Sequence, residues 1–233
     1  MVLPLPGLPV TATGPVDTSP IVLLGARPTD LDPIWTAVVP ELRVRGNDIH
    51  LPISMAYADR LCAASPEADS LVVRIAVLLH DTGWARVDES KIISEGFAKD
   101  WRKAQIRFQH EKASCVIARE VLPPLGYGGR LVDEVCAIID GHDTRQEAHS
   151  LEDAMMRDAD RLWRFTTAGV ALISGWFGIT PAANMDRLRA EIIPELLTEA
   201  GIAMGTAELT RTEAVLKSAI ASQKAINSIR VSP

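Results

Sequence analysis

Apolar residues recur at intervals of three and four along most of this chain, which is the spacing of helices with one buried face. This periodicity predicts helices at about 30–39, 48–64, 67–81, 104–122, 129–141, 151–177, 182–200 and 206–227. The stretch 151–177 contains Gly169 and Gly175, and we expect a break near one of them. The alternation of apolar and polar residues that marks a half-buried strand is scarce. The pattern therefore predicts an all-α fold, a helical bundle.

Residues 1–28 lack this periodicity and are rich in Pro, Gly and Thr. Runs such as PLPGLP and TGP favour turns and extended chain over helix. The full chain of 233 residues is long enough for one sizeable core. We therefore expect an extended or partly disordered N-terminal arm over 1–28, followed by a single helical domain over 29–233.

Composition and charge exclude several classes of protein. Hydrophobic residues make up 47% of the chain and charged residues 23%, the usual balance of a soluble globular domain. A net charge of -6 argues against a large nucleic-acid surface, because phosphate contacts need clustered Lys and Arg. No apolar run is long enough to cross a bilayer, and the apolar N-terminus lacks the basic residues of a secretory signal. The three cysteines form no CxxC pair, which is typical of free thiols in a reducing compartment, so we expect a cytoplasmic protein with no membrane partner.

Four of the five histidines lie about thirty residues apart, at His50, His80, His110 and His142. The apolar helical stripes around His50 and His110 predict that both imidazoles point into the core. One inward histidine is usually a hydrogen-bonded core residue, but two of them together with the pair His80-Asp81 favour metal ligands. The fifth histidine, at position 149, has a polar loop around it and is interpreted as solvated.

An acidic segment, RDADRL at 157–162, supplies the last candidate carboxylate. Helical phase places Asp158 on the apolar stripe of Met155 and Leu162, so periodicity alone favours Asp158 over Asp160. Imidazole and carboxylate ligands without thiolates suit Mn, Fe, Co, Ni or Zn. Six candidate ligands shared by one or two divalent ions leave coordination positions open for water and substrate. This is a catalytic arrangement and not a closed structural site.

The same residues resemble the HD-domain superfamily of metal-dependent phosphohydrolases, which is all-helical and takes its name from a His-Asp pair. The resemblance covers about residues 47–165. It rests on His50 and on the segments LLHDTGW (78–84), QHEKAS (109–114), IIDGHD (138–143) and RDADRLWRF (157–165). The short distance from His142 to DADRL is similar to that in small stand-alone bacterial members, some of which act on nucleotides.

The resemblance implies a ligand set. The family's last ligand is the aspartate of an Ala-Asp-x-Leu segment, which corresponds to Asp160 here, so Asp158 becomes the second choice. The primary metal set would then be His50, His80, Asp81 and Asp160. His110 and His142 would serve a second ion, or the substrate's phosphate if one ion binds.

Two departures from the family pattern bear on the substrate. Some nucleotidase members carry an acidic residue shortly after the His-Asp pair, and TGWA at 82–85 offers none. Close relatives often have Asp-Ala after DADRL, where this chain has Trp163-Arg164. Both departures leave the identity of the substrate open.

The leading hypothesis is hydrolysis of a phosphate ester or anhydride, with nucleotides among the candidates, by a metal-activated water. The partner expected is therefore a small anionic, phosphate-containing substrate. The candidate catalytic residues are Asp81, Glu111 and Asp143, of which Glu111 and Asp143 could accept a proton. The candidate substrate contacts are Lys103, Arg107 and Trp84.

Two other readings compete with hydrolysis. Mixed-valent di-iron oxygenases that act on small polyols or phosphonates share the order H…HD…H…H…D, but the compact spacing from His142 to Asp160 favours hydrolysis. A non-catalytic, ligand-binding HD domain has no need of all six ligands. The apolar stripes beyond residue 175 fit either packing on the core or a homodimer interface.

Overall fold

The computed structural model describes residues 8–21, 29–96 and 103–230. Within these residues the fold is all-helical and contains no β-strand, which confirms the predicted fold class. The α-helices are α1 (Asp32–Val38), α2 (Asn47–Ala64), α3 (Ser70–Leu79), α4 (Glu89–Gly96), α5 (Gln105–Val121), α6 (Gly129–Ile139), α7 (Leu151–Leu162), α8 (Thr167–Phe177), α9 (Pro181–Arg187) and α10 (Glu199–Arg230). Shorter helical turns include η3 (Thr82–Arg86), η6 (Trp163–Phe165), the π-helical η7 (Leu188–Ile192) and η8 (Ile193–Glu195).

The predicted stretch 151–177 is two helices, and the break lies at Thr166 and not at Gly169 or Gly175. Thr166 has extended backbone angles, and its side chain accepts a hydrogen bond from the backbone N–H of Gly169. A threonine in this position caps the start of a helix. The stretch therefore breaks three residues before Gly169, as expected of a break near that glycine, and the side chain of Thr166 caps the new helix.

Two further differences concern short elements. The predicted helix 182–200 divides into α9, η7 and η8, and Pro194 lies in the last of these turns. Helix α4 was not predicted, because its eight residues bury only Ile92 and Gly96 and so carry almost no apolar stripe.

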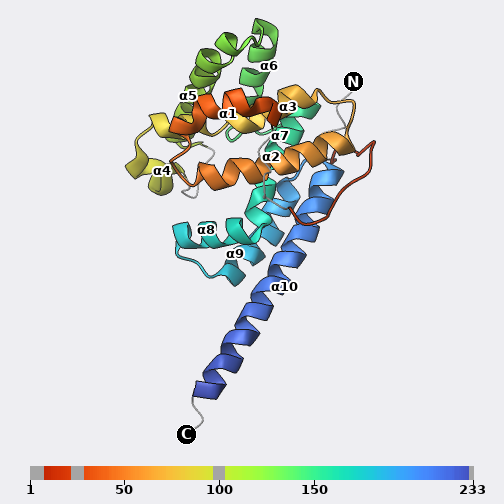
Figure 1. Ribbon diagram of the computed structural model, residues 1–233, viewed down its shortest axis with the longest axis vertical. Coiled ribbons are helices and arrows are strands. Elements are labelled where there is room, and N and C mark those ends of the chain that lie inside the picture. Colours follow the sequence, from red (N-terminus) through yellow and green to blue (C-terminus); the bar gives the residue numbers. More distant parts are fainter. Residues whose placement is uncertain (1–7, 22–28, 97–102, 231–233) are drawn as a thin grey trace.

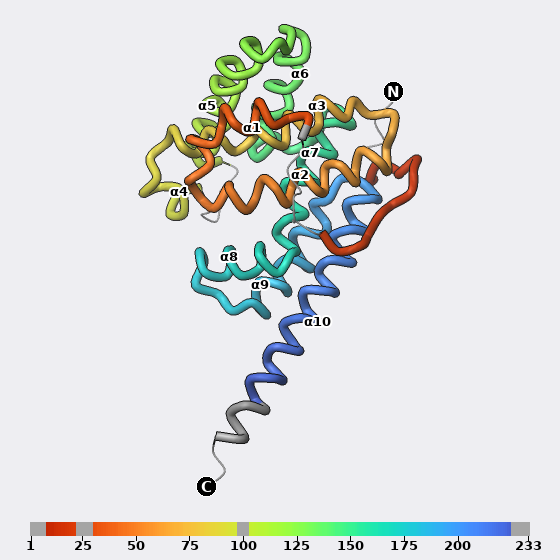
Figure 2. The backbone as a smooth tube through the Cα atoms, in the orientation of Figure 1, coloured from red at the N-terminus to blue at the C-terminus, as the bar shows by residue number. Residues whose placement is uncertain are grey.

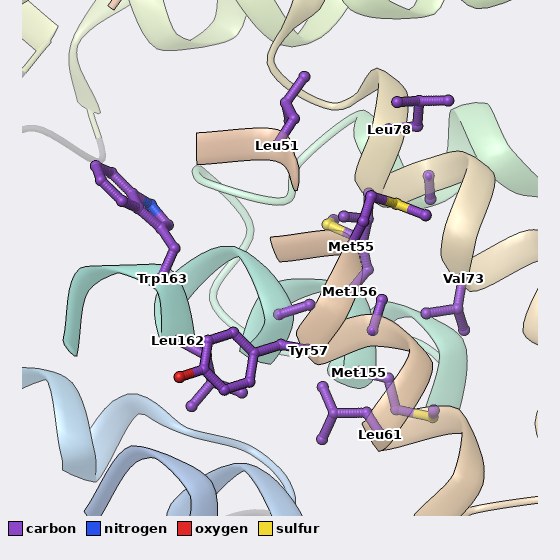
Figure 3. Close-up of a cluster of buried hydrophobic side chains, with 14 of the residues drawn as sticks. Leu51, Met55, Tyr57, Leu61, Val73, Leu78, Met155, Met156, Leu162 and Trp163 are labelled. Carbon is purple, nitrogen blue, oxygen red and sulfur yellow. The ribbon is translucent and has the colours of Figure 1, made fainter. Parts of the chain in front are cut away.

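Helices α2, α3 and α7 meet in the centre of the molecule, where their apolar side chains form the core drawn in Figure 3. Tyr57 and Leu61 of α2 lie against side chains of α7 such as Met155, and Val73 comes from α3. Burial of each large apolar side chain stabilises the fold by about 1.5–3 kcal/mol. The core therefore fixes the three helices that carry or adjoin His50, His80 and Asp160.

The remaining helices surround this centre, as Figures 1 and 2 show. Helices α5 and α6 lie at one end of the molecule, and α8 and α9 lie at its other side, next to the first turns of α10. Helix α10 then extends well away from the other helices. None of the helices in the described part of the chain combines the length and the apolarity needed to cross a membrane.

The described part of the N-terminal arm, residues 8–21, contains no helix and connects two distant helix ends. Val10 exchanges backbone hydrogen bonds of 2.7 and 2.8 Å with Leu197 and Glu199, at the start of α10. The N–H groups of Thr13 and Gly14 donate to the carbonyl oxygen of Ala64, at the end of α2, over 3.0 and 2.7 Å. The arm thus ties α2 to α10.

Candidate metal centre

The six candidate ligands come from five regions of the chain and converge on one buried site. Helix α2 contributes His50 in its first turn, α5 contributes His110, and α7 contributes Asp160. The pair His80-Asp81 lies where α3 ends and η3 begins, and His142 lies in the turn after α6. The side chains of these residues are all buried: His50, His80, Asp81, His110, His142 and Asp160.

A first group gathers His50, His80, Asp81 and Asp160. The Nε2 atoms of His50 and His80 are 3.2 Å apart. Asp160 Oδ1 lies 3.5 and 3.4 Å from these nitrogens, and Asp81 Oδ2 lies 3.8 and 3.7 Å from them. Because one ligand atom from each residue lies within 4.8 Å of all the others, a single ion can contact the whole group.

A second group shares Asp81 with the first. The other carboxylate oxygen, Asp81 Oδ1, lies 3.5 Å from His110 Nε2 and 3.7 Å from His142 Nε2. Asp143 Oδ2 lies at similar distances, 3.6 and 3.7 Å, from the same two nitrogens. Asp81 therefore presents one oxygen to each group, as a bridging carboxylate would.

Backbone carbonyls orient two of the imidazoles. His80 Nδ1 lies 2.8 Å from the carbonyl oxygen of Val77, and His142 Nδ1 lies 2.9 Å from that of Ile139. A carbonyl only accepts, so each Nδ1 carries a proton and each Nε2 faces the site. Outer hydrogen bonds of this kind are typical of metal-binding histidines.

The other two imidazoles contain buried nitrogen atoms that lack a hydrogen-bond partner among the described residues. These atoms are Nδ1 of His50 and both ring nitrogens of His110. Burial lowers the pKa of His50 to about 3, and burial together with the charge of His142 lowers the pKa of His110 well below its usual range. Both rings are thus neutral and able to donate a lone pair to a cation, which fits a metal site.

The surroundings of His142 raise its pKa, whereas those of His50 and His110 lower theirs. Burial alone would lower its pKa, but the carboxylates of Asp143 and Asp81 outweigh burial and raise the pKa to about 9. The concentration of negative charge at this position is what a bound cation would neutralise.

Three arginines surround the carboxylates of the site. Arg45 Nη1 donates to Asp81 Oδ2 over 2.9 Å, Arg164 Nη2 donates to Asp160 Oδ2 over 3.2 Å, and Arg107 forms an ion pair with Asp143. Burial opposes ionisation of Asp160, but Arg164 and His80 hold its pKa well below the usual range. The carboxylates are therefore ionised at neutral pH.

Trp84 and Gly83 fix the His-Asp pair against α5. The indole Nε1 of Trp84 donates to Asp81 Oδ1 over 2.8 Å, and its ring stacks on the ring of His110 with centroids 3.9 Å apart. Ser114 Oγ donates to the carbonyl oxygen of His80 over 2.6 Å and accepts from Gly83 N–H over 2.8 Å. The turn after the His-Asp pair is thus held by buried polar contacts.

Asp158 and Asp160 have different surroundings although only Ala159 separates them. Asp158 accepts hydrogen bonds from the N–H groups of Leu197 and Thr198, each of 2.8 Å, and from Thr198 Oγ1 over 2.7 Å. It therefore holds the chain just before α10, whereas Asp160 lies in the first ligand group.

The remaining predicted residues lie near the site or away from it. Both oxygens of Glu111 accept hydrogen bonds of 2.8–3.0 Å from residues 143 and 144, in the turn that follows His142. Lys103 is exposed just before α5. His149 is exposed as well, and its Nδ1 contacts Asp153 Oδ2 at 2.8 Å, outside both ligand groups.

Sequence reasoning missed Arg45 and Arg164. The backbone of Arg45 has a φ of 59°, in the left-handed region that costs a residue other than glycine roughly 1–2 kcal/mol. Such an outlier beside a site suggests that the position of its side chain matters. For Arg164, the one signal was the departure Trp163-Arg164 from the family pattern.

Comparison with known proteins bears on the central part of the chain. A family model described as HD domain matches residues 48–164, which include all six candidate ligands. No curated protein and no solved structure matches the chain.

Proposed function

The chain belongs to the HD-domain family, and from this premise we propose that it is a metal-dependent phosphohydrolase. It would cleave a small phosphate ester or anhydride with a metal-activated water. The observation that carries the proposal is the pair of buried ligand groups that share Asp81. A bridging carboxylate between two histidine-rich groups suits the attack of water on a phosphoryl centre.

We assign His50, His80, Asp81 and Asp160 to a first ion, and Asp81 with His110 and His142 to a second. The donor set of imidazoles and carboxylates suits Mn, Fe, Co, Ni or Zn. The buried, unpartnered ring nitrogens of His50 and His110 support the assignment. When bound, such ions act as Lewis acids and lower the pKa of water from 15.7 to about 7.

The three arginines would bind the phosphate. Each guanidinium has five N–H donors in a planar fork, enough to contact a carboxylate on one edge and a phosphate oxygen on another. Arg45, Arg107 and Arg164 each contact a different carboxylate of the site. They would place the phosphate beside the metal centre and stabilise the negative charge that develops in the transition state.

The other candidate residues receive positioning roles in this proposal. Burial opposes ionisation of Asp143, but Arg107 and His142 hold its pKa well below the usual range, which makes it a weak proton acceptor. Asp143 would therefore orient Arg107, and Glu111 would hold the turn of Asp143. Trp84 would orient Asp81, and the exposed Lys103 receives no role.

Metal reconstitution with a panel of substrates tests the proposal. Chelator-treated protein is reloaded separately with Mn²⁺, Fe²⁺, Co²⁺, Ni²⁺ or Zn²⁺, and phosphate release is measured from phosphate monoesters, nucleotides and phosphodiesters. Substitution of His80 or Asp81 by Ala should lower the metal content and abolish activity. His149→Ala is the matched control and should retain both, since His149 lies outside the ligand groups.

Two outcomes would replace the proposal with its competitors. An EPR signal of a mixed-valent di-iron centre that changes when a polyol or phosphonate is added would identify an oxygenase. Failure of the purified protein to bind any transition metal would favour a non-catalytic, ligand-binding domain.

A further inference from the structure

A cavity of about 70 Å³ lies beside the metal centre, between η6 and the helices that follow it. Arg45, Arg107 and Arg164 line it on the side of the centre, and Trp176 and Phe177 of α8 line it farther away. At about 10–15 Å³ for each water position, the cavity has room for about five to seven waters. A phosphate group has five non-hydrogen atoms, so the enclosed part matches a phosphate and little more.

The inner end of this cavity carries the positive charge. Its arginines each contact a carboxylate of the metal centre, as described above, so their guanidinium groups lie between the metal ligands and the cavity. Arg107 is buried and the other two are half-buried. The N–H groups that these three guanidinium groups do not use on the carboxylates can donate to the oxygens of a terminal phosphate. Glu191 and Glu195 also line the cavity.

The outer end is aromatic. Trp163 is buried and Trp176 is half-buried, and the centroids of their rings are 6.0 Å apart. Phe177 is half-buried too, and the guanidinium of Arg187 lies 5.9 Å from its ring centre. Trp176 and Phe177 therefore lie at a part of the cavity wall that is partly exposed to solvent.

The distance between the two ends limits the substrate. The guanidinium carbon of Arg45 lies 5.8 Å from the ring centre of Trp176. A phosphate bound at Arg45 and a ring stacked on Trp176 can therefore be separated by only a few bonds. A ring attached to the phosphate directly or through one carbon meets this condition, and a ring beyond a sugar does not.

We propose that this cavity binds a phosphate monoester whose organic group is a flat aromatic ring close to the phosphate. The phosphate would lie against Arg45, Arg107 and Arg164, and the ring against Trp176 and Phe177. This inference rests on the proposed function. The aromatic residues of α8 lie beyond residue 164, where the match to the HD domain ends, so they set specificity in this chain outside the shared domain.

Binding of two phosphonates, which no phosphatase hydrolyses, tests the inference separately from catalysis. Calorimetry on the metal-loaded protein should give a Kd for phenylphosphonate at least about fivefold lower than for methylphosphonate. A stacked ring contributes about 1–3 kcal/mol, and 1.4 kcal/mol is a factor of ten. Trp176→Ala should remove most of this difference, and Trp176→Phe should keep it. Equal affinity for the two ligands, or an unchanged preference in Trp176→Ala, would overturn the inference.

Kinetics with phenyl phosphate and glycerol 3-phosphate complete the test. Trp176→Ala should raise KM for phenyl phosphate about tenfold with little change in kcat, and should raise KM for glycerol 3-phosphate much less. An equal loss with both substrates would overturn the inference, because a merely structural role predicts it. If the wild type hydrolyses neither compound but binds phenylphosphonate through Trp176, the hydrolase proposal fails and the pocket assignment stands.

Discussion

Substitution of Gly83 by Ala should damage the metal centre through backbone contact alone. A Cβ at this position would lie 2.1 Å from the carbonyl oxygen of His110 and 2.5 Å from the backbone nitrogen of Ser114. Both atoms belong to the backbone of α5, so no side-chain rotation relieves the contact. To reach an ordinary separation of 3.4 Å from the carbonyl oxygen, the two backbones must part by about 1.3 Å, the difference between 3.4 and 2.1 Å.

The cost of this movement has two parts. Overpacking of a buried contact costs about 1–3 kcal/mol. The hydrogen bonds that Ser114 Oγ forms with Gly83 N–H and the His80 carbonyl are worth about 1 kcal/mol each, and both would stretch. The sum is about 4 kcal/mol, a large part of the roughly 5–15 kcal/mol that stabilises most domains. The 3.5 Å separation of Asp81 Oδ1 and His110 Nε2 would also widen, so the second ligand group should lose its ion first.

Urea unfolding followed by circular dichroism measures the free energy of unfolding, and elemental mass spectrometry measures metal ions per chain. Gly129→Ala is the matched control, because a Cβ there meets nothing within 4 Å at the start of α6. It should be neutral or stabilising by up to about 1 kcal/mol. If Gly83→Ala fails to fold, Ser114→Ala provides a milder change, with an expected loss of about 2 kcal/mol. A Gly83→Ala protein within about 1 kcal/mol of the wild type, with full metal content, would refute the reasoning.

Three further predictions concern the carboxylates and the metal. Asp158→Ala should cost at least about 2 kcal/mol, because three donors, two of them in buried hydrogen bonds, lose their acceptor. It should leave the metal content unchanged, whereas Asp160→Ala should lower it; equal metal loss in both variants would contradict these roles. Addition of Mn²⁺ to chelator-treated protein should raise Tm, with a stabilisation of about 2.7 kcal/mol at one hundred times the Kd; a Tm that does not respond to any transition metal would count against the site. Burial raises the pKa of Asp158 from 3.8 to about 6, so its protonated form favours the folded state and its contribution to stability is lost as pH rises from about 4 to about 6. At about 1.36 kcal/mol for each pH unit, this loss of stability amounts to about 3 kcal/mol. Urea unfolding at pH 4 and pH 6 should show the loss in the wild type and not in the Asp158→Asn variant. Parallel pH profiles of the two proteins would show that Asp158 does not titrate in this range.

The helices that pack one face against the core were predictable from sequence. Helices α2 and α5 begin and end within about one residue of their predicted bounds. Helix α5 presents an apolar stripe to the core and polar residues elsewhere, whereas α2 is buried on most of its sides. The position of the break between α7 and α8, at Thr166, was not predictable from the glycines of this stretch. It depends on a hydroxyl that accepts the N–H of Gly169, and only backbone geometry shows this.

The choice between Asp158 and Asp160 shows where helical phase stops being informative. Every residue of α7 except Glu152 is buried, so the helix has no solvent face against which an inward direction can be read. Each aspartate is surrounded by protein on its own side of the helix. The resemblance to the HD-domain family favoured Asp160, and the position of Asp160 among the ligand group agrees with that choice.

The arginines around the site were the hardest feature to predict. Basic residues in loops and at helix ends are usually solvated, so nothing local distinguishes Arg45 from the other arginines of the chain. Arg45 contacts Asp81, 36 residues away in the sequence, whereas Arg164 contacts Asp160, four residues before it. Pairing at the separation of Arg45 and Asp81 is a tertiary property that a single sequence does not display.

Helix α10 illustrates how one continuous element can owe its order to two different causes. Its first turns are buried against the fold as far as Thr212, but residues 213–224 are half-buried or exposed. In that outer part the helix depends on helix-favouring alanines and on local ion pairs such as that of Lys217 with Glu213. Each such pair stabilises the helix by about 0.2–0.5 kcal/mol. Local helical order of this kind opens far more readily than packed helix. Amide hydrogen exchange should therefore quicken along α10 with distance from α7, although no break in the backbone separates the slow part from the fast one.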